Sequence, residues 1–262
     1  MYYYLYDSFL SDRKYEKVLD RIKTRLLDLG IQGKHERMSL LKSIEALITD
    51  EAKRGAKTVV VVGNDKTFLK AVDSAVKAGV TLSIIPIGDN NSIAKGLGIP
   101  EAEKACEVLS ARKIAQFDLG QVENNYFFAN LKIDKNLDRI SVSHQGYKII
   151  PKKKCSEISI LNLNFLETAD SKMLNNVNPQ DKMLSLVIKS KLPNKGISGL
   201  FKKNKNYLVD SIIQGNTFEV KSFEYLPILL DEYRVIKTPV SVKLADKRLK
   251  VIIGRSKNIR IN

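Results

Sequence analysis

Residues 58–67 read Thr58-Val59-Val60-Val61-Val62-Gly63-Asn64-Asp65-Lys66-Thr67, a β-branched run that ends in a polar turn with one carboxylate. Four consecutive valines are typical of a strand buried on both faces, as at the centre of a parallel sheet. Residues 68–78 then take a helical period, and Gly79 ends the helix. This order predicts that Asp65 and Thr67 lie at the carboxyl edge of an α/β sheet, where ligands bind.

A second polar turn of the same kind follows the next apolar run. Residues 81–87 read as another strand, and Gly88-Asp89-Asn90-Asn91-Ser92 comes directly after it. Either turn alone is equally explained by ordinary turn and helix-capping chemistry. Two such turns on neighbouring strands of one sheet favour a ligand site.

Composition limits the remaining classes of protein. The chain has 262 residues, 44% of them hydrophobic, which is enough to bury one or two sizeable cores. The two cysteines lie far apart in the sequence and are expected to be reduced thiols. The two histidines lie near no cluster of metal-ligand spacing, so neither a zinc site nor a Ser-His-Asp triad is indicated.

The expected location is the cytoplasm, peripheral to the inner face of the membrane. The chain begins with no basic leader followed by an apolar core and a small-residue cleavage site, so export is not expected. No apolar run approaches the roughly 18 residues of a spanning helix.

Positive charge is concentrated in the second half, where residues 121–262 carry 25 Lys and Arg against 13 Asp and Glu. Its densest stretch runs from Lys189 to Lys205 and mixes lysines with apolar residues. This mixture suits an anionic membrane surface, although a solvated lysine-rich loop explains it as well. Nucleic acid is not indicated, because no aromatic-studded stripe accompanies the charge.

The order of patterns predicts two domains. Residues 1–113 alternate apolar strand runs with helical patterns at 12–29, 39–54, 68–78 and 101–109, which indicates an α/β domain with a parallel sheet. Residues 114–262 contain short apolar or alternating runs separated by turns, which indicates an all-β sandwich. The last two of these runs lie at 240–243 and 249–253.

Four segments resemble the diacylglycerol kinase, sphingosine kinase and NAD kinase superfamily. The first turn resembles its Gly-Gly-Asp-Gly-Thr motif, and residues 85–99 are similar to Pro-x-Gly-Thr-x-Asn-Asp-Phe-Ala-Arg-x-Leu-Gly-Ile of the lipid kinase branch. Residues 117–130 resemble the Asp-Leu-Gly-x-Val hairpin that opens the second domain of that branch. Residues 230–253 resemble its Asp-Gly-Glu, Thr-Pro and closing strand. The four segments keep family order.

The resemblance implies a diacylglycerol kinase-like phosphotransferase that transfers the γ-phosphoryl group of ATP, with Mg²⁺, to a hydroxyl of a diacylglycerol, sphingoid or related lipid. It implies that Asp65 or Asp231 is the base for that hydroxyl, and it does not choose between them. It places the nucleotide on the two turns, on Gly63, Asn64, Lys66, Thr67, Gly88, Asp89, Asn90 and Asn91. The magnesium ligands are not identified. The lipid would be met at an anionic membrane surface.

Several residues depart from the family pattern. Asn64 and Lys66 replace glycines of the first motif, and Ser92 replaces an aspartate of the second. Glu232 stands in place of the glycine of Asp-Gly-Glu, and Asp7-Ser8-Phe9 replaces an Asn-Pro segment with a glycine-bearing loop. These changes leave open a catalytically weakened relative that binds a nucleotide or lipid without turnover. An NAD kinase fits less well, because the matches after residue 85 follow the lipid branch. A homo-oligomer is compatible with the sequence.

Overall fold

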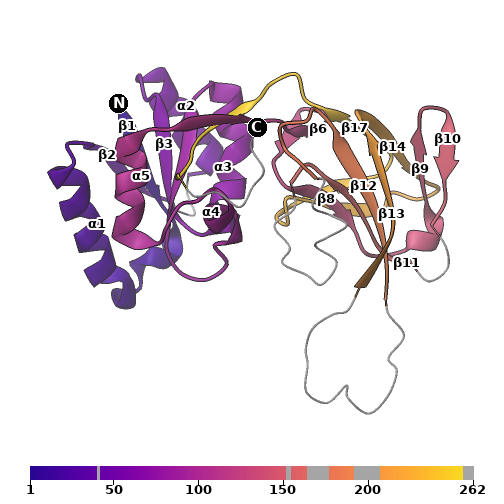
Figure 1. Cartoon of the computed structure of the whole chain (residues 1–262), viewed down its shortest axis with the longest axis horizontal. Coiled ribbons are helices and arrows are strands. Elements are labelled where there is room, and N and C mark those ends of the chain that lie inside the picture. Colours follow the sequence, from indigo (N-terminus) through magenta and orange to yellow (C-terminus); the bar gives the residue numbers. More distant parts are fainter. Residues whose placement is uncertain (40–41, 152–154, 164–176, 192–206, 256–262) are drawn as a thin grey trace, which may run out of the picture. The chain divides into compact units, whose positions relative to one another are not determined.

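The computed structural model describes residues 1–39, 42–151, 155–163, 177–191 and 207–255. The chain forms two compact units (Figure 1). Unit 1 comprises Met1–Asp118 together with the segment that begins at Asp246, and unit 2 comprises Leu119–Ala245. This arrangement confirms the expected fold class of an α/β part followed by an all-β part.

Unit 1 is built on one mixed, mainly parallel sheet, here called sheet 1. In spatial order its strands are β2 (Gly33–Arg37), β1 (Tyr2–Tyr6), β3 (Thr58–Gly63), β4 (Thr81–Pro86), β18 (Leu249–Ile252) and β5 (Ile114–Phe117). The first five run parallel, and β5 is antiparallel to β18. Every residue of β3 and β4 is buried, as the valine run predicts for central parallel strands.

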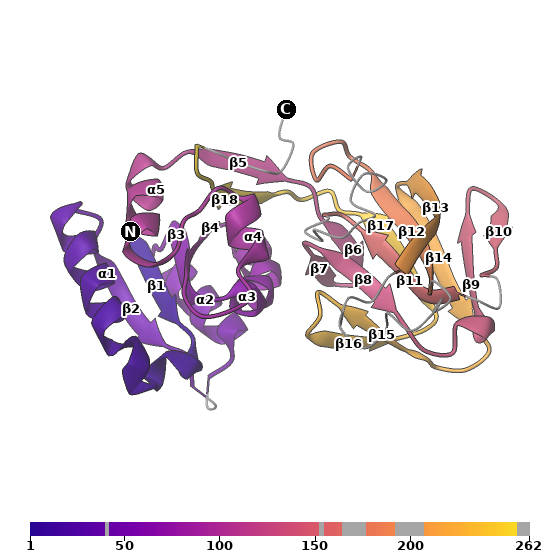
Figure 2. The ribbon, with the colours of Figure 1, turned by 60° about the horizontal axis from the view of Figure 1, so that its bottom comes forward.

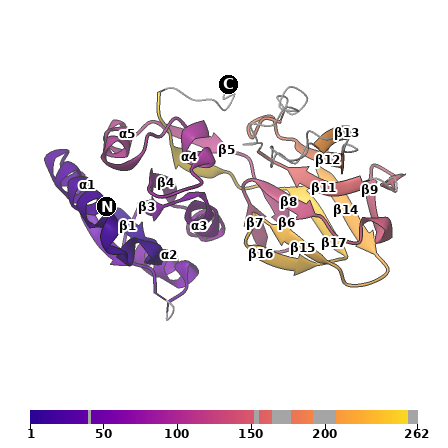
Figure 3. The same ribbon diagram turned by 90° about the horizontal axis from the view of Figure 1, so that it is seen from below.

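Helices cover both faces of sheet 1 (Figure 3). They are α1 (Glu16–Asp28), α2 (Ile44–Lys53), α3 (Asp65–Ala78), α4 (Ser92–Gly96) and α5 (Ala105–Ala111), with short 3₁₀ turns η1 (Ser8–Ser11), η2 (Arg13–Tyr15) and η3 (Ala102–Lys104). The helix α3 contains the helical pattern of residues 68–78 but begins earlier, at Asp65, because Asn64 caps it, and Gly79 with a φ of 69° provides the left-handed cap at its end. The expected helix at 12–29 starts later, because Asp12 caps the 3₁₀ turn η2 with its side chain.

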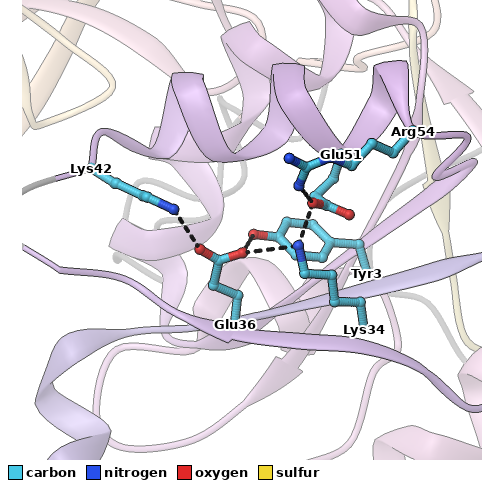
Figure 4. Close-up of polar contacts among 6 residues, drawn as sticks. All are labelled: Tyr3, Lys34, Glu36, Lys42, Glu51 and Arg54. Atoms are coloured by element: carbon cyan, nitrogen blue, oxygen red, sulfur yellow. Dashed lines mark hydrogen bonds and ion pairs between the residues drawn. The ribbon is translucent and has the colours of Figure 1, made fainter.

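The edge strand β2 is absent from the sequence-based expectation, because Gly-Lys-His-Glu-Arg shows no apolar alternation. Ion pairs fix it to the sheet and to α2 (Figure 4). The carboxylate of Glu51 on α2 is 2% exposed and bonds to Lys34 of β2 and to Arg54. Tyr3 of β1 donates its hydroxyl to Glu36 at 3.1 Å. Polar side chains therefore supply the contacts that apolar ones give elsewhere.

Unit 2 is a sandwich of two antiparallel sheets (Figure 2). Sheet 2 has the order β10 (Tyr147–Ile149), β9 (Ile140–His144), β14 (Thr217–Ser222), β17 (Val240–Leu244), β6 (Gly120–Val122) and β7 (Asn125–Phe127). Sheet 3 has the order β13 (Tyr207–Gly215), β12 (Leu184–Lys191), β11 (Cys155–Leu161), β8 (Asn130–Ile133), β15 (Pro227–Leu230) and β16 (Arg234–Lys237). Inward-facing residues of both sheets, such as Phe218, Val242 and Ile160, form its core.

The expected division at residue 113/114 needs a correction, because residues 114–117 and the closing strand belong to unit 1. The pattern of residues 249–253 fits a sandwich strand equally well, yet β18 lies between β4 and β5 in sheet 1. Its register pairs Leu249 with Phe117 and Ile252 with Ile114. Unit 2 is therefore inserted, in sequence, between two paired strands of unit 1.

No helix within the described residues is long and apolar enough to cross a membrane.

Candidate functional site

The candidate site of unit 1 lies at the carboxyl edge of sheet 1, where β1, β3 and β4 end. Asn64 follows β3 and caps α3, because its side-chain oxygen accepts from the backbone N–H of Thr67 at 3.3 Å. Asp65 is the first residue of the helix, and Lys66 follows with its side chain exposed. Neither Asn64 nor Lys66 has a positive φ, so the loss of the family glycines does not strain this turn.

Asp65 joins the two polar turns. Its carboxylate accepts from the backbone N–H groups of Ile93, at 2.9 Å, and Ala94, at 3.4 Å, in the first turn of α4. Its own N–H donates to the carbonyl of Asn90 at 3.1 Å. Asn64 therefore caps α3, and Asp65 caps the first turn of α4.

Thr67 does not present its hydroxyl at the surface. It is fully buried, and its Oγ1 donates to the carboxylate of Asp7, which follows β1. Gly63 is required beside this pair, since a Cβ there would lie 2.8 Å from Oγ1 of Thr67. Asp7 also accepts from the N–H of Phe9 at 3.2 Å. The carboxylate of Asp7 therefore links the end of β1 to the first turn of α3.

The second turn carries Gly88, whose φ of 81° needs glycine. A Cβ at Gly88 would lie 3.4 Å from the ring of Phe9 and 3.5 Å from the hydroxyl of Tyr15, and those two rings contact each other edge to face. Asn91 donates Nδ2 to the carbonyl of Gly88 at 2.7 Å. Asp89 and Asn90 are exposed.

The predicted residues of the two turns thus come together, and the structure adds three that the sequence analysis did not select. These are Asp7, Phe9 and Tyr15, which follow the end of β1. The sequence could have indicated Asp7, because its carboxylate directly follows the apolar run of residues 2–6, which forms the first strand. No local pattern indicates the two aromatic rings, because they lie beside Gly88 only in the folded chain.

Asp231, the second candidate base, lies in unit 2 after β15. It is 1% exposed, and its carboxylate accepts from the N–H groups of Phe128 and Ala129 at 2.8 Å and of Asn130 at 3.0 Å. Burial raises the pKa of Asp231 to about 6, against the opposing effect of the three N–H donors. Asp65 and Asp231 belong to different units, so their expected approach to one cleft stays a prediction.

Glu232 explains why glycine suits the position after Asp231. Its φ is 60°, a left-handed conformation that costs a residue with a side chain about 1 kcal/mol. Replacing the glycine of Asp-Gly-Glu by Glu232 therefore adds backbone strain at this position.

The described residues offer no obvious ligand set for Mg²⁺. Among them, no three His, Cys, Asp or Glu side chains gather closely enough to hold a metal ion. The carboxylates of Asp65 and Asp231 are both bonded to backbone N–H groups, which compete with a cation.

The expected lysine-rich surface at 189–205 needs a partial correction. Lys189 is 6% exposed and donates to Glu157 at 2.8 Å, so it cannot face a membrane. Residues 192–206, which hold the lysines at 195, 202, 203 and 205, lie outside the described residues.

Comparison with known proteins confirms the resemblance. Residues 3–122 match the family model of the diacylglycerol kinase catalytic domain. Proteins named "Probable lipid kinase YegS" from Salmonella arizonae and Salmonella newport are each 35% identical over 115 residues, which is 41% of this chain and 38% of the relative. The chain therefore spans less than two thirds of these relatives.

Solved structures match over nearly the whole chain. A crystal structure titled as a diacylglycerol kinase from Bacillus anthracis str. Sterne superposes with a TM-score of 0.75 and 13% identity, covering 97% of both chains. A second structure from the same organism gives a TM-score of 0.73 at 14% identity. At this identity the likeness shows the fold, while residues 3–122 carry the sequence signature of the family.

Proposed function

We propose that this protein is an ATP-dependent lipid kinase that transfers a phosphoryl group to the hydroxyl of a diacylglycerol, sphingoid or related lipid. The observation that carries the proposal is the contact between Asp65 and the first turn of α4. This contact joins the two polar turns at the carboxyl edge of sheet 1. Both turns lie within residues 3–122, which match the family model of the diacylglycerol kinase catalytic domain. The nucleotide would bind along this edge.

Phosphoryl transfer requires positioned groups more than covalent chemistry from the protein. Lys66 is exposed beside the first turn, where its ammonium group can meet phosphate oxygens. Asp65 is the candidate base within unit 1, provided that it leaves one of its N–H partners when substrate binds. Mg²⁺, when bound, would supply charge neutralisation at the phosphates. Because the described residues provide no ligand cluster, the proposal assigns it no protein ligand.

A second candidate function is a module that binds nucleotide or lipid without turnover. Its support is that both candidate bases already serve as hydrogen-bond acceptors for backbone N–H groups. The hydroxyl of Thr67 is likewise bonded to Asp7. In this case the site binds its ligand but lacks a free base.

Thermal unfolding with MgATP tests nucleotide binding, and labelled ATP with a lipid panel and NAD tests transfer. MgATP at millimolar concentration should raise the melting temperature, because a ligand of the folded state stabilises it by mass action. Gly88→Arg should abolish this rise, since the new side chain would enter the space beside Phe9 and Tyr15.

The matched control is Gly79→Arg, at a φ of 69° with nothing within 4 Å, which carries the same backbone strain outside the site. It should keep the MgATP shift. Binding without transfer to any lipid or NAD would favour the second candidate. No binding of MgATP by the wild type would contradict the kinase and a nucleotide-binding module, and would leave only a module that binds lipid.

A further inference from the structure

The loop between β14 and β15 holds two aromatic side chains in solvent. Phe223 is 103% exposed and Tyr225 is 78% exposed. A phenylalanine without any cover gives up the free energy that burial would provide. Such side chains are expected where they meet another surface.

This loop is firmly held, so the exposure of its rings is a fixed feature. Thr238 is 1% exposed, accepts from the N–H of Leu226 at 2.8 Å and donates to the carbonyl of Glu224 at 2.9 Å. The carboxylate of Glu224, between the two aromatic residues, receives both of its bonds from Arg139, at 2.7 and 2.8 Å. The pair neutralises the one carboxylate that lies between the rings in sequence.

Lysines lie on the outer face of sheet 2, whose strand β14 leads into this loop. Phe218 and Val220 of β14 point into the core, as do Val240 and Val242 of β17, so Lys221 and Lys243 point outward. On β10, Ile149 packs on the core, which leaves Lys148 outward, and Ile150 next to it is 63% exposed. The register places β10, β9, β14 and β17 side by side (Figure 1).

We propose that this outer face, together with the loop that follows β14, docks on an anionic lipid bilayer. The docking face consists of Lys148, Ile150, Lys221, Phe223, Tyr225 and Lys243. Its three lysines face outward with one carboxylate, Glu219, among them, so the face has a net positive charge. The aromatic and aliphatic side chains enter the headgroup region while the lysines attract anionic lipid. The proposal rests on the proposed function only in that a lipid acceptor requires access to a membrane.

Sedimentation with vesicles of phosphatidylglycerol and phosphatidylcholine, compared with pure phosphatidylcholine, tests the docking face in the full chain. Wild type should bind the anionic vesicles at low salt and release from them as salt increases. Replacing Lys148, Lys221 and Lys243 by Gln should weaken binding on the order of 100-fold, at about fivefold per lysine. Phe223→Ser with Tyr225→Ser should weaken it about tenfold and reduce the binding that survives at high salt.

The control variant is Val235→Ser with Lys237→Gln on β16, at the edge of sheet 3. Val235 is 63% exposed and Lys237 is exposed, so one apolar side chain and one lysine are lost elsewhere on unit 2. This variant should bind as wild type does. Equal losses in control and docking-face variants, or no loss in the latter, would overturn the proposal.

Phosphorylation of detergent-dispersed lipid separates this proposal from the proposed function. Docking-face variants should keep that activity and lose activity on vesicles. A wild type that binds vesicles through this face but phosphorylates no lipid would refute the kinase and leave the docking face supported.

Discussion

Asp65 and Asp231 illustrate how one residue type serves the fold at two distant places. Each carboxylate accepts backbone N–H groups from a segment far along the chain, Ile93 in one case and Phe128 in the other. Hydrogen bonds to a charged acceptor contribute about 1.5–3 kcal/mol each. The motifs could select these carboxylates as important. They could not reveal the partners, because a cap made across 28 or 103 residues leaves no local pattern.

Burial of Asp231 predicts a specific dependence of stability on pH. Its pKa rises from 3.8 in the unfolded chain to about 6, so the folded state holds the proton more tightly. The contribution of Asp231 to the free energy of unfolding should therefore fall by about 2 kcal/mol as pH rises from 4 to 7. Denaturant unfolding of wild type and Asp231→Asn across this range should show the difference between them changing by that amount.

Carboxyl chemical shifts of Asp231 give an independent measurement if the Asn variant does not fold. A pKa below 3.8 by this method would contradict the prediction, and would mean that the three N–H donors outweigh burial.

At the scale of elements, prediction from sequence works where apolar periodicity is strong. The central strands β3 and β4 and the helix α3 agree with their patterns, because burial on one or two faces determines those residues. The strand β2 does not follow from the sequence, since ion pairs with α2 stabilise it. The short helix α4 lies where its residues predict a short helix, but its cap comes from another element, and its own residues do not encode that contact.

Removal of that cap should be measurable in the stability of unit 1. Asp65→Ala leaves the N–H groups of Ile93 and Ala94 without their acceptor, and should lower the free energy of unfolding by about 1–2 kcal/mol. Asp65→Asn keeps one acceptor oxygen and should cost less. Asp89→Ala, an exposed residue of the neighbouring turn, is the control and should change stability by less than about 0.5 kcal/mol. Equal stability of the Asp65→Ala and Asp89→Ala variants would show that the contact does not support α4.

At the scale of the whole chain, unit 1 is discontinuous in sequence, because unit 2 is inserted between β5 and β18. The last strand returns to sheet 1, and Asp118 and Arg248 form an ion pair at 2.8 Å where the chain leaves and re-enters unit 1. The sequence of a short apolar strand does not indicate which sheet the strand joins. The pattern of residues 249–253 is therefore compatible with either unit. Pairing with β4 and β5 places the strand in sheet 1, and this pairing exists only in the completed fold.

The return of β18 predicts which fragments fold. A fragment of residues 1–118 lacks the strand between β4 and β5, leaves β5 without its partner and exposes the edge of β4, so it should not unfold cooperatively. Joining Asp118 to Asp246 through a short Gly-Ser linker should restore a cooperative thermal transition, because β5 and β18 are antiparallel neighbours that a hairpin can connect.

Residues 119–245 alone should also fold, since both sheets of the sandwich and their core lie within them. Circular dichroism during heating measures all three fragments. A cooperative transition in the 1–118 fragment would show that sheet 1 is stable without its closing strand.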